Sequence, residues 1–308
     1  AGYSNPHLFM RGNVPARSHG NIMKCISLSE TESKKITEKA RANLVSVNTI
    51  IQGAWSLLLS AYFNTGNVVF GTSVSGRSND FPNMDLLTGM FMNILPVCSI
   101  IDKHCSLKEW LQSFQKRQVA CLKYEETKAT EILSQVCKTK GGIMFDSLLV
   151  FENFPWKNLK CGDVEISDYG SGVTSNYPIS LIIVPGTKME FKFIFSTDQL
   201  DERTKNWIID NWEGVLKLIL SDEVTQIRQV LDDIGVFYRD DSVQKGLEVP
   251  KIEALSVNYV APRNEIEEQL VKIWENLLGI DKVGVMDNYF ELGGKSIMAI
   301  QMFALIES

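Results

Sequence analysis

The stretch from Ile179 to Ser196, Ile-Ser-Leu-Ile-Ile-Val-Pro-Gly-Thr-Lys-Met-Glu-Phe-Lys-Phe-Ile-Phe-Ser, decides the fold class. Pro185 and Gly186 separate two apolar runs, and this arrangement predicts a β-hairpin. In the second run every other residue is apolar and most of these are aromatic: Met189, Phe191, Phe193 and Phe195. Alternate residues of a strand point to the same face, so this face is expected to lie in a core.

Helix and strand patterns alternate on both sides of the hairpin. Asp201 to Leu220 follows directly as a predicted helix, and its inward positions carry Trp207, Ile208, Trp212, Val215, Leu216 and Ile219. Further predicted strands cover residues 21–28, 67–74 and 145–153, and further predicted helices cover about 30–43, 46–62 and 106–124. Strands that alternate with helices and pack through their apolar faces predict an α/β fold, with helices layered on a sheet.

Composition limits the class of protein. The chain has 308 residues, of which 44% are hydrophobic, and a formal net charge of −6. The length favours two domains, and the negative charge argues against nucleic acid or an anionic membrane as a partner. No apolar run approaches the ~20 residues of a membrane-spanning helix. Six cysteines without a Cys-x-x-Cys pair argue against a zinc site and favour a reducing, cytoplasmic setting, and we expect no metal.

Changes of pattern divide the chain into three parts. The first domain is predicted to span residues 1–235, and within it residues 1–20 lack periodicity and are expected to form an arm or loop. Residues 236–259 have mixed charge with glycine and proline, which is typical of a linker. Residues 260–308 begin an α-helical part, in which Asn264 is expected to cap a helix.

Near the end of the chain, residues 287–296 read Asp-Asn-Tyr-Phe-Glu-Leu-Gly-Gly-Lys-Ser. The paired glycines permit a tight turn, and the apolar residues that follow have helical spacing. Ser296 is therefore expected at a helix start, where free N–H groups and the helix dipole favour a phosphate. A nucleotide-binding P-loop would need a glycine where Tyr289 stands. The tetrapeptide Gly-Gly-Lys-Ser by itself is more often an ordinary turn that caps a helix.

The full ten-residue stretch resembles the attachment motif of carrier-protein domains in nonribosomal peptide and polyketide synthases. The resemblance implies 4'-phosphopantetheine on Ser296, with aminoacyl or peptidyl groups carried as thioesters and a phosphopantetheinyl transferase as a partner. It covers residues 260–308, so the implied carrier domain is partial, an all-α segment that stops within the helix beginning at Ser296. We therefore expect a piece of a multidomain synthetase that is truncated at both ends.

Residues from about 15 to 235 resemble the C-terminal lobe of a condensation domain of nonribosomal peptide synthetases, which has a chloramphenicol-acetyltransferase-like fold. The matching segments, in the order of the family, are Phe70 to Arg77, Thr88 to Pro96, Leu148 to Pro155 and Asn176-Tyr177-Pro178. The resemblance implies a tunnel between two lobes, in which an acceptor amine attacks a donor thioester. It also implies a separate N-terminal lobe and neighbouring synthetase domains as partners.

Three polar residues of these segments are candidates for the substrate tunnel. Arg77 is expected to contact a pantetheine phosphate or to hold a structural salt bridge, with the structural role the more common. Asn93 and Asn153 are expected to place an amide in the tunnel or to satisfy a strand end. The family's His-His-x-x-x-Asp-Gly motif is absent, because the three histidines of the chain, His7, His19 and His104, are never adjacent. We therefore expect no catalytic residue in this chain.

Three hypotheses follow. The first is a synthetase fragment in which an acceptor-side lobe is joined to a carrier. The second is a docking module that catalyses nothing and needs a separate N-terminal lobe. The third, a free-standing acyltransferase of the chloramphenicol-acetyltransferase type, requires a catalytic histidine, and His104 is the only one within the predicted folded part.

Overall fold

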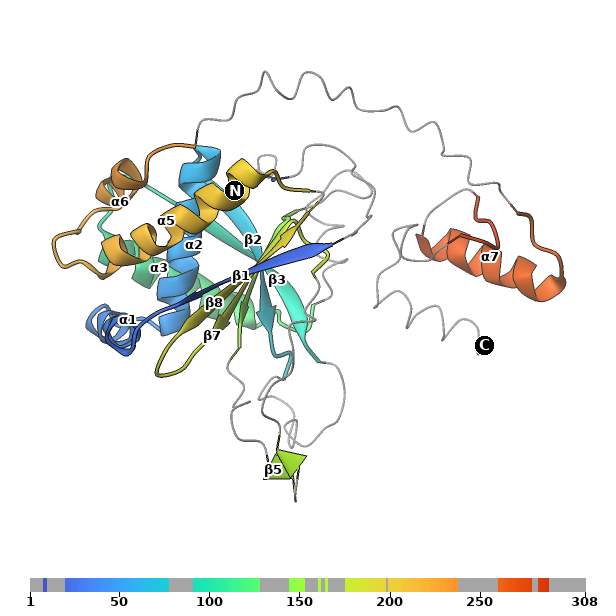
Figure 1. Cartoon of the computed structure of the whole chain (residues 1–308), viewed down its shortest axis with the longest axis horizontal. Helices are drawn as coiled ribbons and strands as arrows, with labels where there is room; N and C mark the ends of the chain where they lie inside the picture. Colours follow the sequence, from blue (N-terminus) through green and yellow to red (C-terminus); the bar gives the residue numbers. More distant parts are fainter. Residues whose placement is uncertain are drawn as a thin grey trace. The chain divides into compact units, whose positions relative to one another are not determined.

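The computed structural model divides into two compact units, and each is described by itself. The α/β unit comprises Ala1–Met10 and Gly20–Arg239, and the C-terminal unit comprises Arg11–His19 and Asp240–Ser308 (Figure 1). The structure describes residues 8–9, 20–77, 91–127, 144–152, 160–161, 164–165, 175–197, 199–237, 260–278 and 282–287.

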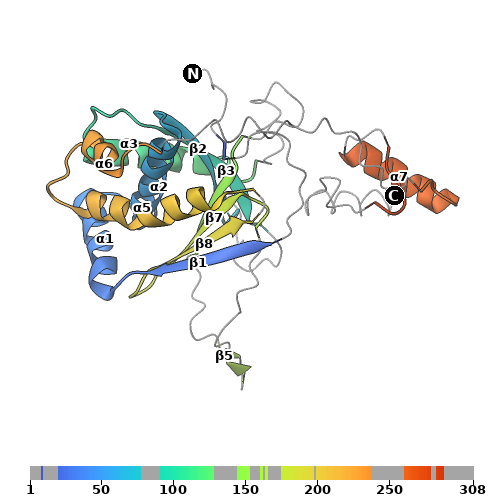
Figure 2. The ribbon, with the colours of Figure 1, turned by 45° about the horizontal axis from the view of Figure 1, so that its top comes forward.

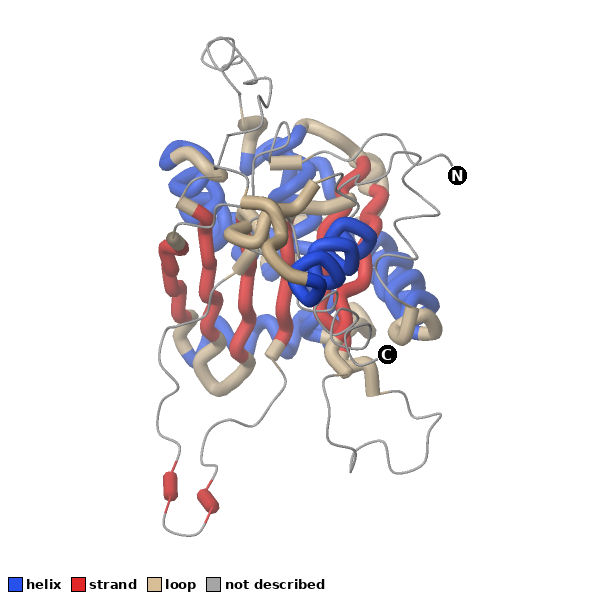
Figure 3. The backbone as a smooth tube through the Cα atoms, turned by 90° about the vertical axis from the view of Figure 1, so that its right-hand side faces the viewer, coloured by secondary structure: helices blue, strands red, loops and turns tan. Residues whose placement is uncertain are grey.

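A six-stranded mixed sheet forms the centre of the α/β unit, and Figure 3 shows its strands side by side. The strand order is β1-β8-β7-β4-β2-β3, in which β4 runs parallel to β2 and β7 and the other neighbours are antiparallel. The predicted hairpin is confirmed as β7 and β8. The strands of this sheet are β1 (Asn21–Ser27), β2 (Asn67–Val74), β3 (Asn93–Ile100), β4 (Ser147–Phe151), β7 (Ile179–Val184) and β8 (Glu190–Ser196), and β5 (Lys160–Cys161) and β6 (Val164–Glu165) form a separate pair.

The aromatic face of β8 is buried under the helices, as its alternation predicts. Phe191 and Phe193 contact the Trp212 ring at centroid distances of 5.2 and 5.7 Å, and Phe193 lies 6.5 Å from Trp55. Figure 2 shows the helices of this unit gathered on one side of its sheet. They are α1 (Glu30–Ala42), α2 (Val47–Phe63), α3 (Leu107–Leu122), α5 (Glu202–Leu220) and α6 (Ile227–Ile234).

Helix α2 is the central helix of this layer, and its residues from Thr49 to Tyr62 are all buried. Its first turn is capped by the Ser46 hydroxyl, which accepts a hydrogen bond from the Thr49 N–H at 3.0 Å. The chain then leaves the helix at Asn64, which adopts the left-handed conformation with φ of 49°. These local signals explain why this helix was predictable with nearly correct bounds.

Besides the short pair β5 and β6, the structure contains two elements that the sequence patterns did not assign, α6 and β3. Helix α6 is only 8 residues long, too short for a clear helical period, and it buries Ile227, Val230 and Leu231. Strand β3 contains Pro96, which lacks a backbone N–H and argues against a central strand. The proline is tolerated because β3 is the last strand in the order of the sheet.

A lysine joins α1 to the end of α5. The Lys39 ammonium donates hydrogen bonds to the Ser221 carbonyl at 2.9 Å and to the Asp222 carboxylate at 2.8 Å. The Lys39 side chain is only 15% exposed, whereas that of Asp222 is 98% exposed. The hydrogen bond from Lys39, followed by its positive charge, lowers the pKa of Asp222 below the ordinary value of 3.8.

The lowered pKa of Asp222 predicts a pH-dependent contribution to stability. The ionised group is favoured in the folded state, so its contribution is complete above pH 3.8 and is lost as the pH falls through the folded-state pKa. We expect Asp222→Asn to lower the free energy of unfolding at pH 7 and to differ less from the parent as the pH falls below 3.8. Urea unfolding at several pH values measures this difference. Glu223→Gln is the matched control, and an equal, pH-dependent effect of that substitution would contradict the assignment.

The C-terminal unit contains the helix predicted after residue 260. Helix α7 (Glu265–Leu278) is capped by the Asn264 side chain, which accepts a hydrogen bond from the Glu267 N–H at 2.9 Å. The segment after the helix returns to its start, since the Val285 N–H donates to the Val260 carbonyl at 3.0 Å. Residues from 288 onward, which include Ser296, lie outside the described residues.

Among the described residues, no single helix is long and apolar enough to cross a bilayer. Helices α1 and α2 reach the required length and hydropathy only when taken as a pair, with a bend of 99° between them.

Candidate functional site

The turn after β2 brings two of the predicted tunnel residues to the same end of the sheet. Gly76 has a φ of +62°, and a Cβ at this position would lie 1.8 Å from the Phe91 carbonyl oxygen. The turn therefore presses backbone against backbone, which only glycine allows. Asn93 begins β3 and lies opposite Val74 of β2, so two of the four segments that resemble the family meet here.

Arg77 packs against an aromatic ring of the chain itself. Its guanidinium carbon lies 4.7 Å from the centroid of the Phe91 ring, a cation–π arrangement. Its backbone N–H donates to the Ser75 hydroxyl at 3.3 Å. The side chain is half-buried, so the structure gives Arg77 a role in holding the two strand ends together and leaves part of it accessible.

The Asn93 side chain is fully used by the backbone around it. Its amide nitrogen donates to the carbonyls of Glu125 at 2.8 Å and Thr127 at 2.9 Å, and its oxygen accepts from the Ile94 N–H at 2.9 Å. These bonds tie the start of β3 to the segment that follows α3. Of the two roles expected for Asn93, the structure favours the satisfaction of a strand end.

Replacing Asn93 with aspartate tests this role. A carboxylate cannot donate, so it would leave the carbonyls of Glu125 and Thr127 without their donor, and we expect a loss of about 1–3 kcal/mol in the free energy of unfolding. Asn67→Asp makes the same chemical change at the exposed start of β2 and should cost much less. Urea unfolding of both variants measures the difference, and equal effects would show that the Asn93 amide is not a structural tie.

An aromatic pair covers the sheet face that points away from the helices. A Cβ on Gly71 would lie 2.3 Å from the Phe145 ring, so the ring rests directly on the glycine. Tyr177 stacks on Phe145 with centroids 5.9 Å apart and an interplanar angle of 17°. Burial raises the pKa of Tyr177, which therefore stays a neutral phenol. A glycine inside a strand pattern was the available sequence signal for this close approach.

The structure describes only one of the remaining residues singled out from the sequence, His104. Asn153 and Ser296 lie outside the described residues, although β4 ends at Phe151, two residues before Asn153. His104, the only histidine in the described part of the chain, is exposed, and its backbone N–H donates to the Asp102 carboxylate at 2.9 Å. Within the same described residues, no group of His, Cys, Asp and Glu side chains is arranged to hold a metal ion.

The model of the condensation-domain family matches residues 13–232 of the sequence. The chain belongs to the condensation-domain family. The matched residues nearly coincide with the larger segment of the α/β unit, Gly20–Arg239. All the residues described for this site therefore lie within a condensation domain. They include the turn at Gly76, the start of β3 at Asn93 and the Phe145–Tyr177 pair.

Curated relatives of this condensation domain belong to multidomain synthetases. The chain is 33% identical over 221 residues to a linear gramicidin synthase of Brevibacillus parabrevis, in a match that covers 71% of this chain and 4% of that protein. It is 26% identical over 271 residues to a mycosubtilin synthase of Bacillus subtilis, in a match that covers 85% of this chain and 10% of that protein. The chain therefore spans a small fraction of the length of these relatives.

Solved structures confirm the fold of the condensation domain. The first condensation domain of the CDA synthetase superimposes with a TM-score of 0.60 at 12% identity, over 73% of this chain and 50% of that chain. A four-domain nonribosomal peptide synthetase bound to AMP and glycine gives a TM-score of 0.61 at 16% identity, over 90% of this chain and 21% of that chain. The expected chloramphenicol-acetyltransferase-like fold, a sheet with packed helices, is confirmed, and the sheet is mixed.

Proposed function

We propose that the chain is the acceptor-side, C-terminal lobe of an amide-forming condensation domain, joined through a linker to the beginning of a peptidyl carrier domain. In this proposal residues 1–235 form the lobe, residues 236–259 the linker and residues 260–308 the partial carrier. Ser296 is the attachment residue for 4'-phosphopantetheine, and the partner is the N-terminal lobe of the same synthetase.

The extent of the structural match carries the proposal of a half-domain. The α/β unit accounts for most of the matched 73% of this chain, yet the match covers only 50% of the condensation domain to which it is compared. Half of a two-lobed domain is one lobe. The assignment to the C-terminal lobe is supported by the order of the matching segments, from Phe70 to Pro178, and by a sequence in which no two histidines are adjacent.

The carrier is supported by matches that continue beyond the family model. The alignment with the mycosubtilin synthase covers 85% of this chain, a larger share than residues 13–232 represent. The residues before position 13 are too few to supply the difference, so this alignment must continue past residue 232. Helix α7 begins this part with its Asn264 cap, and the Gly-Gly-Lys-Ser sequence at 293–296 follows it.

The chemistry of amide formation indicates what each of the two lobes must supply. An acceptor amine attacks the carbonyl of a donor thioester, a C–N bond forms, the C–S bond breaks and the thiol leaves. The amine must lose a proton during this step, so a base or a positioning group is required. The described residues around the Gly76 turn offer Arg77 and Asn93, neither of which serves as a base, and the lobe described here therefore shapes the acceptor side of the cleft.

The N-terminal lobe of the same synthetase, produced separately, tests the half-domain directly. We expect it to associate with this chain in a 1:1 complex, because a cleft between lobes requires an interface of at least about 1,000 Å². Analytical ultracentrifugation of each partner alone and of their mixture measures the stoichiometry. Two species that sediment independently at all ratios would contradict the proposal.

A further inference from the structure

Two segments from opposite ends of the α/β unit meet on one aromatic ring. Tyr62, in the last turn of α2, contacts the ring of Phe9 at a centroid distance of 4.8 Å and the ring of Phe237 at 4.7 Å. Phe9 belongs to the expected N-terminal arm, and Phe237 belongs to the expected linker. We call Phe9, Tyr62, Trp207 and Phe237 the aromatic clasp.

The far end of the Tyr62 ring is held by a hydrogen bond. Its hydroxyl lies 3.0 Å from the Thr204 hydroxyl of α5, and both residues are buried. Because the phenol oxygen is held on α5 and the backbone on α2, the ring is held at both ends. Phe237 stacks on that ring with an interplanar angle of only 20°.

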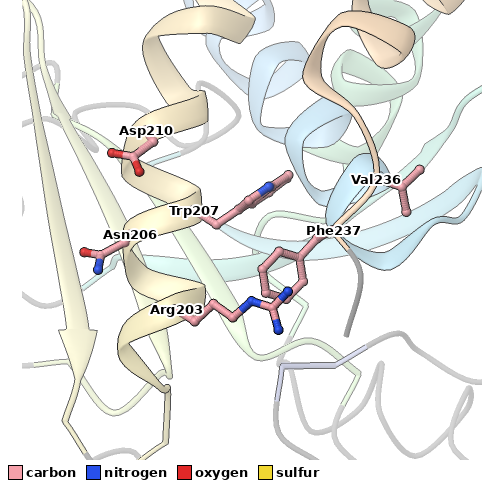
Figure 4. Close-up of a pocket in the computed structure, with 6 residues that line it drawn as sticks. All are labelled: Arg203, Asn206, Trp207, Asp210, Val236 and Phe237. Carbon is pink, nitrogen blue, oxygen red and sulfur yellow. The ribbon is translucent and has the colours of Figure 1, made fainter. Parts of the chain in front are cut away.

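Phe237 is held from three further directions. The Trp207 ring meets it edge-on at 5.4 Å, and the Arg203 guanidinium lies 5.0 Å from its centroid. Its backbone N–H donates to the Ala61 carbonyl at 3.4 Å. Figure 4 shows Arg203 and Trp207 directed from α5 toward Phe237. The chain is thus anchored at the position where the sequence pattern predicts a linker.

A surface hollow of about 420 Å³ lies beside Phe237. It is lined by Arg203, Asn206, Trp207, Asp210, Val236 and Phe237 (Figure 4). Its charged residues, Arg203 and Asp210, are exposed rather than buried, so the hollow has no built ligand site. It leaves one flank of Phe237 open to solvent, and Phe237 is only half-buried whereas Phe9 is 8% exposed. Phe237 is therefore more exposed to solvent than Phe9.

We propose that the aromatic clasp couples the N-terminal arm to the exit of the linker, so that release of either Phe9 or Phe237 loosens the other through Tyr62. The Phe9 and Phe237 rings both restrict rotation of the Tyr62 ring about the axis between its two held ends, and loss of one of them lets the ring turn away from the other. Residues that share a contact partner in this way have non-additive effects. The proposal uses contacts within the α/β unit only and is independent of the proposed function.

Coupling of this kind has a consequence for a multidomain chain. Phe237 is the last described residue of the α/β unit, and in this proposal its hold on α2 and α5 depends on the contact that Phe9 makes with Tyr62. The clasp is therefore a conformational device that links the two ends of one domain.

Hydrogen exchange of the full chain, followed by mass spectrometry, tests the coupling. We expect Phe237→Ala to increase the exchange of the peptide that contains Phe9 severalfold, and Phe9→Ala to do the same for the peptide that contains Phe237. Phe237→Leu keeps an apolar side chain without a ring, and it should give a smaller increase. If each alanine variant affects only its own segment, the proposal is wrong.

A matched control separates coupling from general loss of stability. Phe114→Leu removes a buried ring that stacks on Trp110 at 5.7 Å, away from the clasp. This variant should not increase exchange selectively at Phe9 and Phe237, and the same selective pattern in Phe114→Leu would overturn the proposal. In the double variant Phe9→Ala/Phe237→Ala, we expect the loss of stability to be smaller than the sum of the single losses. Additive losses would also overturn it.

Discussion

Replacing Ser296 with alanine is expected to abolish attachment of the pantetheine arm completely. The phosphodiester is proposed to form on the Ser296 hydroxyl, and alanine has no oxygen to accept it. The parent synthetase is treated with coenzyme A and a phosphopantetheinyl transferase, and the intact mass and the modified peptide are determined. We expect the peptide that contains position 296 to carry the arm in the parent and to lack it in the variant.

Ser308→Ala is the matched control for this experiment, because it removes another hydroxyl from the same part of the chain. It should load as the parent does. Absence of the arm from the peptide that contains position 296 in the parent, or its presence there in Ser296→Ala, would remove the carrier from the proposed function and leave the condensation lobe untouched.

Replacing Gly76 with alanine is expected to be the most destabilising single-atom change in the described α/β unit. The φ of +62° strains any side chain, and the new Cβ would lie 1.8 Å from the Phe91 carbonyl oxygen. Backbone cannot rotate away as a side chain can, so the backbones at positions 76 and 91 must move apart. We expect a loss of more than about 4 kcal/mol in the free energy of unfolding, which places this variant among exceptional substitutions.

The variant Gly235→Ala separates the cost of an unfavourable backbone conformation from the cost of a steric clash. Gly235 has a similar φ of +71°, but no atom lies within 4 Å of its added Cβ. Its variant should lose only the cost of the backbone conformation, about 1–3 kcal/mol. Urea unfolding of the two variants gives the comparison. Equal losses in the free energy of unfolding would contradict this prediction. They would mean that the turn at Gly76 accommodates a Cβ and that its close approach to Phe91 does not contribute to the cost.

Local patterns were sufficient for most elements of the fold. The alternation in β8 and the Asp201 cap of α5, whose carboxylate accepts from the Thr204 N–H at 2.6 Å, are encoded within a few residues. The order of strands is not encoded locally. Strand β1 pairs with β8, with Asn21 opposite Ser196. The sequence of neither strand indicates which other strand it pairs with. Strand pairing across such sequence distances is decided by packing of the whole domain.

The candidate site shows the same limit. Asn93 was predictable as a polar residue at a strand end, but the carbonyls that occupy its amide belong to Glu125 and Thr127, more than thirty residues away. Phe9 and Phe237 lie in segments without periodicity, and their packing on Tyr62 depends on the meeting of α2 and α5. Short apolar runs in irregular segments, Leu8 to Met10 and Val236 to Tyr238, were the available sequence signal for these anchors.

Amide formation from two loaded carriers tests the central claim most directly. The assay compares this chain alone, the N-terminal lobe of the same synthetase alone, and the two together, with the amide product measured by mass spectrometry. The proposal of an acceptor-side lobe predicts product only when both lobes are present. Turnover by this chain alone would contradict it, because the groups that carry out the chemistry would then lie within these 308 residues.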